Sequence, residues 1–327
     1  MPLTHTGLVG LVGRHATYVP LRWSDMDVYS HVNNIVYLRY LQEARVDMLF
    51  VHAHRQGAEG LAGGTVVTRH EIDYRSPLEY RQRPLLVETW VRDVRNSTFT
   101  LGYELVDVGD DGGRTVYAVA TTTLAPYDLA AGRPRRVADK ERKVLDGYRD
   151  PAGPEPGIAR NGAGATDRAV DDPGESKPHV HACPVRFDDL DSYGHVNNVT
   201  FVDYLQEARA DFAHRYLLDL LGPDEGWVVA NVTIDYLAPV PFRTDPLDVR
   251  VWVTRVGGSS VELAYDVRDE AAVYATARTT LVGYNLRTQS SRKLAAAERA
   301  AMESFMVGLT AVTPAGGPGG SSEEAAS

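Results

Sequence analysis

The sequence predicts an α+β protein built from two copies of one unit, in which a long helix precedes an antiparallel sheet. Three observations support this fold class. A segment near the N-terminus recurs in the second half of the chain, each copy continues into an apolar stripe with helical spacing, and alternating apolar and polar residues follow. Since the helix and strand patterns occupy separate stretches, each helix should pack on one face of its sheet.

The internal repeat is the strongest of these observations. Residues 21–47, LRWSDMDVYSHVNNIVYLRYLQEARVD, match residues 185–211, VRFDDLDSYGHVNNVTFVDYLQEARAD, with 15 of the 27 positions identical. The match continues with HEIDYRSP at 70–77 and VTIDYLAP at 232–239, and strand-like segments recur toward the end of each copy. Self-similarity on this scale indicates that a whole folding unit has been duplicated.

The repeat sets the domain boundaries. We expect the first unit over 15–148 and the second over 180–300. The intervening segment 149–179 is rich in Pro, Gly and Asp and lacks an apolar period, which predicts a flexible linker. The C-terminal tail, 301–327, ends in small and polar residues and is expected to be largely disordered.

An amphipathic helix opens each unit. Apolar residues recur at spacings of three and four after the HVNN segment, which is the periodicity of a helix with one buried stripe. The stripe residues are Val36, Tyr37, Tyr40, Leu41, Ala44, Met48 and Leu49 in the first unit, and Phe201, Val202, Leu205, Ala208 and Phe212 in the second. An Asn before each stripe lies where a helix N-cap belongs.

The strands have the clearest pattern. Apolar side chains alternate with polar ones over 98–105 and again over 261–267, which predicts antiparallel strands with one buried face. The sequence DDGG at 110–113 indicates a hairpin turn after the first of these strands.

Composition limits the function classes. The chain has 327 residues, a formal net charge of −10 and 43% hydrophobic residues, which is typical of a soluble protein of about two domains. An acidic chain repels phosphate, so we expect no nucleic-acid partner and no membrane partner. Its single cysteine, Cys183, cannot form an internal disulfide. Without a signal-peptide pattern or an apolar run of membrane-spanning length, the expected location is the cytoplasm.

The repeated motifs resemble those of a known family. DMDVYSHVNN followed by YLQEAR, and then the pattern IDYxxP, is similar to the hotdog-fold thioesterases of the 4-hydroxybenzoyl-CoA thioesterase type. The loop DxDxxxHVNN also resembles the corresponding loop of plant acyl-ACP thioesterases. The resemblance covers both repeats and implies two tandem hotdog units, each a long helix wrapped by an antiparallel sheet. It further implies that the units pair through their sheets as an intrachain pseudo-dimer, with active sites where they meet.

On this resemblance we expect an acyl-CoA thioester hydrolase that uses no cofactor and no metal ion. Thioester hydrolysis needs a base or nucleophile and a group that stabilises the oxyanion. The family's catalytic carboxylate matches Asp27 and Asp191, acting as general base or as nucleophile. Taken alone, an Asp before a helix more often caps a turn. Asp25 and Asp189 are expected to hold the loop.

His31 and His195 follow these carboxylates by four residues. Each either acts on the thioester, by polarising its carbonyl or orienting the Asp, or holds the loop through its ring. The acyl-ACP thioesterase pattern has a functional His here, but also an Asn where this chain has Tyr29 and Tyr193. That departure argues against an Asn–His mechanism.

Four asparagines open the two helices. Asn33 or Asn34, and Asn197 or Asn198, are expected to cap the helix, and the other of each pair is a candidate to face the thioester or to fix a water molecule. The free N–H groups and the positive end of the helix dipole suit a developing oxyanion. Because both copies keep these residues, we expect two competent sites per chain.

Glu43 and Glu207 on the helices are secondary catalytic candidates. For Glu43 the alternative is an ion pair with Arg39, four residues earlier. The second unit has Asp203 at that position, which would repel Glu207, so a local ion pair does not account for both glutamates.

Two basic clusters are candidates for binding the phosphates of coenzyme A, since guanidinium and ammonium groups pair with phosphate. They are Arg133, Arg135 and Arg136 in the first unit, and Arg287, Arg292 and Lys293 in the second. Solvated surface charge is the alternative.

Other activities compete with this hypothesis. The alternatives are an acyl-ACP thioesterase, a hotdog hydratase of enoyl thioesters and a non-catalytic acyl-CoA-binding module. The sequence has no GxSxG elbow, no Walker loop and no zinc-spaced set of Cys and His. Exposed sheet edges would allow a homodimer of chains.

Overall fold

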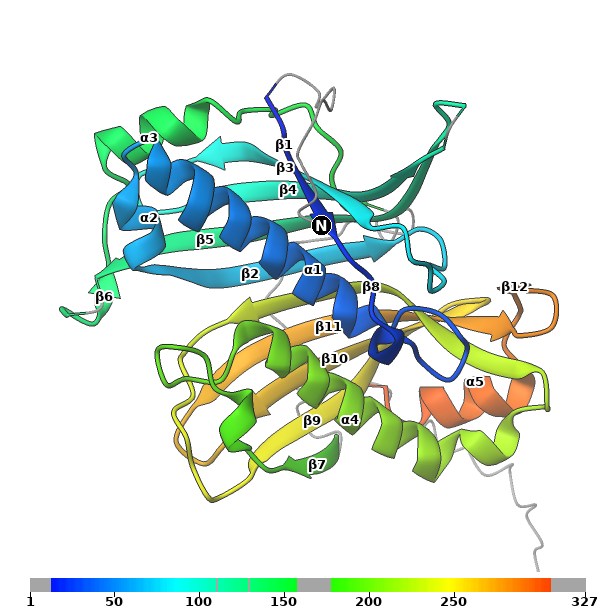
Figure 1. Cartoon of the computed structure of the whole chain (residues 1–327). Helices are drawn as coiled ribbons and strands as arrows, with labels where there is room; N and C mark the ends of the chain where they lie inside the picture. Colours follow the sequence, from blue (N-terminus) through cyan, green and yellow to red (C-terminus); the bar gives the residue numbers. More distant parts are fainter. Residues whose placement is uncertain (1–12, 110, 129, 158–177, 307–327) are drawn as a thin grey trace, which may run out of the picture.

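A long helix lies against each of two neighbouring groups of strands (Figure 1). The computed structural model describes residues 13–109, 111–128, 130–157 and 178–306. We call the part before the linker unit 1 and the part after it unit 2. The predicted α+β architecture, with one long helix and one set of antiparallel strands in each copy, is confirmed.

Apart from α2 (Glu59–Gly63) of unit 1, which has no α-helical counterpart in the described part of unit 2, the two units share their order of elements. Unit 1 contains β1 (His15–Val19), α1 (Asn34–Val46), α2 (Glu59–Gly63), β2 (Thr65–Tyr74), β3 (Leu85–Val94), β4 (Phe99–Val108), β5 (Arg114–Asp128), β6 (Arg133–Pro134) and α3 (Asp139–Asp146). Unit 2 contains β7 (His179–Cys183), α4 (Asn198–Tyr216), β8 (Glu225–Tyr236), β9 (Leu247–Val256), β10 (Ser260–Arg268), β11 (Val273–Asn285), β12 (Ser290–Ser291) and α5 (Ala296–Glu303).

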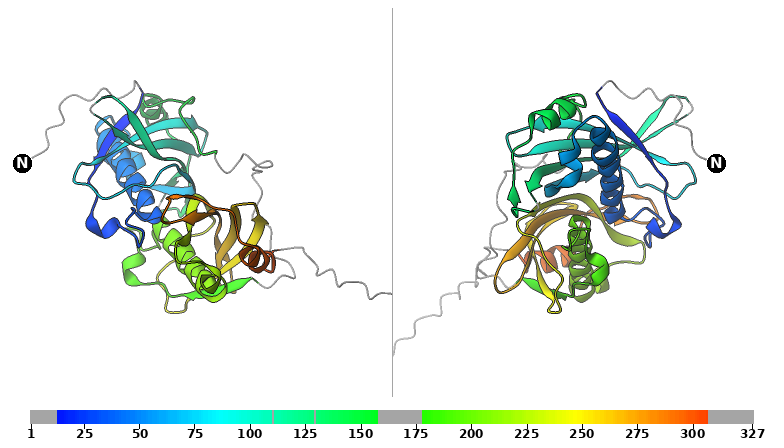
Figure 2. Two further views of the ribbon diagram at one scale, coloured as in Figure 1. Left: turned by 90° about the vertical axis from the view of Figure 1, so that its right-hand side faces the viewer. Right: turned by 60° about the vertical axis from the view of Figure 1, so that its left-hand side comes forward.

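One antiparallel sheet runs through both units. Its strands follow the order β1-β3-β4-β5-β2-β8-β11-β10-β9-β7, with β6 and β12 as short additions on β5 and β11. The units join where β2 pairs with β8, and there His70 lies opposite Ile234 and Ile72 lies opposite Val232. Helices α1 and α4 meet at the same boundary (Figure 2). Residues more than 150 positions apart in the chain are therefore brought together along this seam.

The predicted apolar stripes form the contact between helix and sheet. Every residue of both stripes is buried, and each large apolar side chain contributes roughly 1.5–3 kcal/mol by leaving water. The helices themselves differ in one respect. In unit 1 the α-helix ends at Val46 and a π-helical turn, Asp47–Ala53, carries the last stripe residues, whereas α4 continues to Tyr216.

The outer face of the unit 1 sheet is partly covered, so the prediction of a single buried face is wrong there. Glu88 of β3 and Glu104 of β4 are buried. Both accept hydrogen bonds from Arg14 and Arg114 at 2.8 to 3.1 Å. The Arg14 guanidinium also lies 4.1 Å from the centre of the Trp90 ring. Buried carboxylates are tolerated at this position because each is paired with a guanidinium.

Part of the predicted linker packs onto unit 1. Residues 149–157 run back along the sheet, where the Asp150 N–H donates to the Val91 carbonyl at 3.0 Å and the Gly157 N–H donates to Asp73 Oδ2 at 2.6 Å. The rest of the linker prediction, except its last two residues, lies outside the described residues, as does most of the predicted tail.

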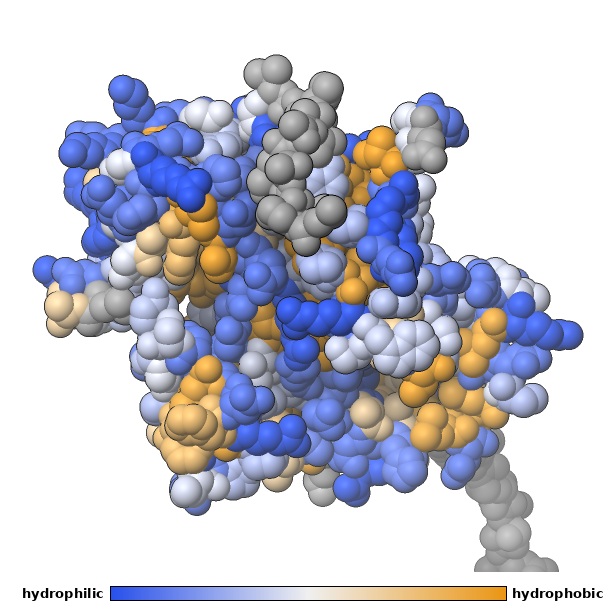
Figure 3. All heavy atoms as spheres, viewed as in Figure 1, coloured by the Kyte–Doolittle hydropathy of each residue, from blue (hydrophilic) through white to orange (hydrophobic). Residues whose placement is uncertain are grey.

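One face of the molecule is mostly polar. The face in Figure 3 is largely hydrophilic and carries separate apolar patches. The exposed aromatic residues Trp23 and Phe187, at matching positions of the two units, each contact a second aromatic ring edge-on. Among the helices that the structure describes, none combines the length and the apolar character needed to cross a membrane.

Candidate active site

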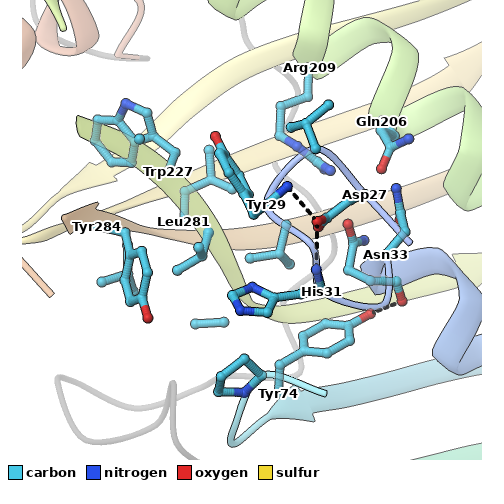
Figure 4. A pocket seen from close by; sticks show the side chains of 18 of the residues that line it. Asp27, Tyr29, His31, Asn33, Tyr74, Gln206, Arg209, Trp227, Leu281 and Tyr284 are labelled. Carbon is cyan, nitrogen blue, oxygen red and sulfur yellow. Dashed lines mark hydrogen bonds between the residues drawn. The ribbon is translucent and has the colours of Figure 1, made fainter. Parts of the chain in front are cut away.

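A cavity of about 720 Å³ lies where the two units meet. Unit 1 contributes the loop before α1, the first residues of α1 and the end of β2, and unit 2 contributes α4, β8 and β11 (Figure 4). The polar lining includes Asp27, Tyr29, His31, Asn33, Asn34, Tyr74, Gln206 and Arg209, and the apolar lining includes Leu217, Leu221, Trp227, Val229 and Leu281. The cavity thus combines the loop singled out by its motif with an apolar wall from the other unit.

Asp27 holds its loop with one carboxylate oxygen. Oδ1 accepts hydrogen bonds from the N–H groups of Tyr29 at 2.8 Å and of His31 at 3.1 Å (Figure 4). Oδ2 accepts none from any residue that the structure describes. One side chain can therefore cap the turn and still present an oxygen to the cavity that it lines.

The same loop is built in unit 2. Asp191 Oδ1 accepts hydrogen bonds from the N–H groups of Tyr193 at 2.8 Å and of His195 at 3.2 Å. The turn requires one residue in the left-handed region, which is Ser30 in unit 1, with φ of 61°, and Gly194 in unit 2, with φ of 77°. Glycine adopts this conformation without the steric cost that a side chain adds.

Asp25 and Asp189 make the expected loop-holding contacts. Asp25 Oδ2 accepts hydrogen bonds from the Arg22 N–H at 2.7 Å and from the Tyr40 hydroxyl at 2.6 Å. Asp189 repeats both bonds in unit 2, at 2.7 Å each. Each carboxylate thus ties its loop to the helix that follows.

Asn33 caps the helix, and the residue after it lines the cavity. Asn33 Oδ1 accepts a hydrogen bond from the Ile35 N–H at 3.0 Å, and Asn197 makes the same bond in unit 2 at 2.9 Å. Asn34 begins α1, and its carbonyl accepts a hydrogen bond from the Tyr74 hydroxyl at 2.7 Å. The Asn34 N–H has no backbone partner within the described ranges. A free donor therefore stands at the positive end of the helix.

The second asparagine of each pair differs between the units. Asn198 Nδ2 lies 2.9 Å from Nε2 of His70, a residue of β2. Asn34 Nδ2 is buried and finds no hydrogen-bond partner in the described part of the chain. Burial lowers the pKa of His70 well below its ordinary value, so the ring is neutral. His70 is not among the predicted site residues, and the only signal for it is that the repeat has Val232 in its place.

The His31 ring points into the cavity (Figure 4). Its backbone N–H donates to Asp27, and His195 uses its own N–H in the same way toward Asp191. In both units the backbone therefore holds the loop. The His31 imidazole makes no hydrogen bond to another described residue, which leaves it free to meet a substrate.

Four other residues of the cavity wall are not among the predicted ones. They are Tyr74, Gln206, Arg209 and Trp227. Tyr74 belongs to the IDYxxP motif, and Gln206 and Arg209 belong to YLQEAR, so the repeat marked three of them without indicating that they face a cavity. Arg209 forms no ion pair with the residues described here.

Glu43 and Glu207 are exposed and do not line the cavity. Their positions give no support to a catalytic role there. The suggested ion pair of Glu43 with Arg39 is not formed, because Arg39 pairs with Asp203 of α4 at 3.4 Å. This contact joins the two units.

The two basic clusters divide into clamped and exposed residues. Arg135 pairs with the buried Glu141 at 2.6 Å, and Arg292 pairs with the buried Glu298 at 2.7 Å. These guanidinium groups fasten the chain to α3 and α5, which argues against the prediction that they bind phosphate. The remaining members are Arg133, Arg136, Arg287 and Lys293, and all four are exposed. Ser291 lines the cavity, so the exposed part of the unit 2 cluster lies close to it in the chain.

One group of side chains has the composition of a metal site. Ligand atoms of His15, Asp47 and His52 lie within 4.8 Å of one another, close enough to hold a metal ion. However, His15 Nε2 and Asp47 Oδ2 are hydrogen-bonded at 2.8 Å, and unit 2 repeats the pair with His179 and Asp211 at 2.9 Å. The recurrence indicates a structural contact between the first strand of each unit and its helix.

Comparisons with known proteins cover both units. The family model described as the thioesterase-like superfamily matches residues 21–145 and again residues 185–307. An acyl-ACP thioesterase from Bacteroides thetaiotaomicron is 14% identical with a TM-score of 0.59, covering 82% of this chain and 98% of that one. The 12:0-ACP thioesterase from Umbellularia californica is 17% identical with a TM-score of 0.61, covering 85% of this chain and 99% of that one. At these identities the similarity shows the fold alone.

One curated relative matches part of a unit. The chain is 35% identical over 82 residues to "Uncharacterized protein YsmA" of Bacillus subtilis (strain 168). The match covers 25% of this chain and spans 54% of the length of that relative.

Proposed function

The chain belongs to the thioesterase-like superfamily, and we propose that it is a hydrolase of acyl-CoA thioesters, which it cleaves where the Asp27 loop meets α4. Two groups at the cavity wall carry this proposal. They are the free Oδ2 of Asp27 and the unbonded N–H of Asn34 at the start of α1. Thioester hydrolysis needs a base or nucleophile and an oxyanion donor, and this loop supplies both.

The Asp27 carboxylate acts in one of two ways. As general base, Oδ2 takes a proton from a water molecule while the water oxygen adds to the carbonyl carbon. The tetrahedral intermediate then collapses, the C–S bond breaks, and the leaving thiolate receives the proton. As nucleophile, Oδ2 itself adds to the carbonyl carbon and displaces the thiolate, and water then hydrolyses the resulting anhydride. Both routes use the same oxygen and regenerate the carboxylate.

The start of α1 stabilises the oxyanion. The Asn34 N–H points out of the helix at the positive end of its dipole. Two hydrogen bonds fix the first turn of α1 before substrate arrives. The Tyr74 hydroxyl donates to the Asn34 carbonyl, and the Ile35 N–H donates to Asn33 Oδ1. A donor held in this way needs no reorganisation during the reaction. The His31 ring, on the same cavity wall, is placed to hydrogen-bond the carbonyl or the attacking water.

The two ends of the substrate find matching surroundings. Leu217, Leu221 and Trp227 of unit 2 supply an apolar wall for the acyl group, and the cavity of about 720 Å³ is of the size that small-molecule pockets have. The exposed Lys293 supplies positive charge for the phosphates of coenzyme A, together with the exposed Arg287, which pairs with Asp224 at 3.3 Å.

We also propose that the two units act as an intrachain pseudo-dimer. The pairing of β2 with β8 sets the Asp27 loop against α4 of the other unit, and α4 completes the cavity. Asp191 makes the same loop contacts in unit 2, so the fold builds two candidate carboxylates per chain.

Acyl carrier protein is the alternative carrier, because the two solved structures described above are named ACP thioesterases. The test presents one acyl group on coenzyme A and on acyl carrier protein and compares kcat/KM for thiol release. The variant Asp27→Asn/Asp191→Asn serves as the background control. A higher kcat/KM on coenzyme A supports the proposal, and a higher kcat/KM on the carrier protein would replace acyl-CoA with acyl-ACP as the substrate.

A further inference from the structure

The two halves of the chain keep the same loop but differ in what surrounds its second asparagine. His70 on β2 and Val232 on β8 occupy matching places in the repeat, within HEIDY and VTIDY. Since these strands pair with each other, both side chains lie at the seam, His70 opposite Ile234 and Val232 opposite Ile72. Both are buried. An imidazole therefore replaces an alkyl group at one of two otherwise matching positions.

We call the Asp27 loop with α4 the first site and the Asp191 loop with the facing part of unit 1 the second site. In the second site, His70 links two polar side chains. Its Nε2 lies 2.9 Å from Asn198 Nδ2, and its Nδ1 lies 2.8 Å from Thr122 Oγ1. The consistent proton arrangement has Asn198 donating to Nε2, and Nδ1–H donating to Thr122. The Asn198 amide can turn to a substrate only by breaking a buried hydrogen bond.

The first site has a counterpart of the asparagine and of the threonine in this series of hydrogen bonds, but no histidine between them. Thr279 lies opposite Val232, as Thr122 lies opposite His70. Thr279 Oγ1 and Asn34 Nδ2 are both buried, and neither has a hydrogen-bond partner in the ranges described. Val232 offers no donor or acceptor to either. Asn34 lines the cavity, so a turn of its side chain, which breaks no hydrogen bond to a described residue, would bring this amide to a ligand.

The arginine at the matching position of each long helix also differs between the two sites: it lines a cavity in the first site and is buried in the second. Arg209 of α4 lines the open cavity of the first site. Its counterpart in the repeat, Arg45 of α1, is buried, and its Nη1 has no partner among the described residues. Burial first, and the charge of Arg45 second, lower the pKa of His70. The ring therefore stays neutral and keeps Nε2 as an acceptor for Asn198.

We propose that the two sites are unequal: the first site carries the turnover, with the Asn34 side chain donating to the bound thioester, and His70 silences the second site by holding Asn198. This inference rests on the proposed function. His70 acts through Asn198 and is a positioning residue. This proposal of one productive site differs from the expectation of two competent sites per chain, which came from the shared loop.

A single substitution in the Asp27 loop distinguishes a chain with one productive site from a chain with two. Asp27→Asn keeps the oxygen Oδ1, which accepts hydrogen bonds from the N–H groups of Tyr29 and His31, and replaces the free oxygen Oδ2 with an uncharged amide nitrogen. With one productive site, this variant should lose at least about 100-fold in kcat for acyl-CoA hydrolysis. Two equal sites would leave about half of the activity, because the second site would be untouched. Retention of half the wild-type rate would overturn the proposal.

The matched position tests the role of His70. In the Asp27→Asn background, His70→Val should raise turnover about tenfold by freeing Asn198. His70→Gln, which keeps an acceptor, is the control and should not raise it. In the wild-type background, Val232→His should reduce turnover about tenfold by engaging Asn34. Thermal unfolding followed by circular dichroism establishes that each variant is folded. No change with Val232→His, together with no rise with His70→Val, would contradict the proposal.

Binding stoichiometry gives a readout that does not need catalysis. Isothermal titration with a non-hydrolysable thioether analogue of acyl-CoA should give one equivalent per wild-type chain, and two in the His70→Val variant. Two equivalents on the wild-type chain would overturn the inequality of the sites. A wild-type protein that hydrolyses no thioester would overturn the proposed function, whereas the binding ratio would still decide whether the sites differ.

Discussion

His15 Nε2 on β1 lies 2.8 Å from Oδ2 of Asp47, the residue directly after α1, and this contact fastens the first strand of unit 1 to its helix. The same Oδ2 accepts a hydrogen bond from the Thr17 hydroxyl at 3.0 Å. Unit 2 repeats the contact between His179 and Asp211 at 2.9 Å. Because β1 and β7 are the end strands of the sheet, each has only one neighbouring strand, and this contact adds an anchor.

Removing this contact should destabilise the protein. Asp47→Ala is expected to lower the free energy of unfolding by about 1–3 kcal/mol, because it leaves the buried His15 without its partner. Urea unfolding followed by circular dichroism measures the change. Asp146→Ala, which removes an exposed pair with Arg149, is the control and should cost less than about 0.5 kcal/mol. Equal costs for the two variants would contradict a structural role for the contact.

A buried amide crosses the seam between the units. Asn231 Nδ2 on β8 donates to Asp73 Oδ1 at 2.7 Å and to the Ile72 carbonyl at 3.1 Å. Asn231→Leu should lower the free energy of unfolding by about 2–4 kcal/mol, since it removes a donor from a buried carboxylate. Arg69→Ala, at the matching place on β2, breaks a half-exposed pair with Asp235 and should cost less than about 1 kcal/mol. Urea unfolding of the two variants measures both losses of stability. A larger loss for Arg69→Ala than for Asn231→Leu would refute the stabilising role of the buried amide.

Stability should fall in mild acid. Burial is the main cause of the lowered pKa values of His15, His70 and His179. The unfolded chain titrates near its ordinary pKa of about 6.5 and so binds more protons than the folded chain as the pH drops below about 7. Stability is therefore fully present above that range and is lost toward about pH 5. Each such histidine contributes at most about 1.4 kcal/mol per pH unit.

The variant His70→Gln isolates the largest of these effects. The free energy of unfolding should depend less steeply on pH between about 7 and 5 in this variant than in the wild type. His214→Gln, at an exposed position of α4, is the control and should leave the slope unchanged. A slope in His70→Gln that matches the wild type would show that His70 titrates alike in the folded and unfolded states.

The apolar wall should set the acyl preference. Ala213 of α4 lines the cavity, and Ala213→Phe would fill part of the space proposed for the acyl chain. We expect kcat/KM to fall about tenfold more for long-chain acyl-CoA than for acetyl-CoA, which corresponds to about 1.4 kcal/mol of lost binding. Ala297→Phe, exposed on α5, is the control. A uniform loss across chain lengths would place the acyl chain elsewhere.

The exposed and the ion-paired members of the basic clusters should affect different quantities when they are replaced. Lys293→Ala removes an exposed charge near the cavity and should raise KM for acyl-CoA about threefold with kcat unchanged. Arg135→Ala breaks the pair with buried Glu141 and should lower the melting temperature without raising KM. An increase in KM with Arg135→Ala alone would restore the original phosphate-binding prediction.

The repeat made much of the fold and the loop predictable. Because Asp27, His31 and the asparagines recur in both copies, the motif indicated the loop and its helix cap, and its unit 1 copy lines the cavity described above. Alternation predicted the strands, but it could not reveal that Glu104 lies buried against Arg14 instead of facing water. The alternation of apolar and polar residues shows that a side chain lies on the opposite face of the sheet, but it does not show which group pairs with that side chain.

The rest of the site depends on contacts between distant segments. Arg209 and Trp227 reach the Asp27 loop only because β2 pairs with β8, and no local pattern predicts that pairing. His70 stands out only as a departure from the repeat, and its meaning comes from Asn198, 128 residues away in the chain. The π-helical turn after α1, which brings His52 close to Asp47, likewise has no counterpart in α4.

Thiol release from a panel of short, long and aromatic acyl-CoA thioesters tests the central claim most directly. It should be measured for the wild type and for Asp27→Asn/Asp191→Asn, with circular dichroism to establish that both are folded. We predict turnover of at least one acyl class by the wild type and a loss of at least about 100-fold in the double variant. A folded wild type that releases no thiol, or a double variant as active as the wild type, would contradict the assignment of a carboxylate-dependent acyl-CoA hydrolase.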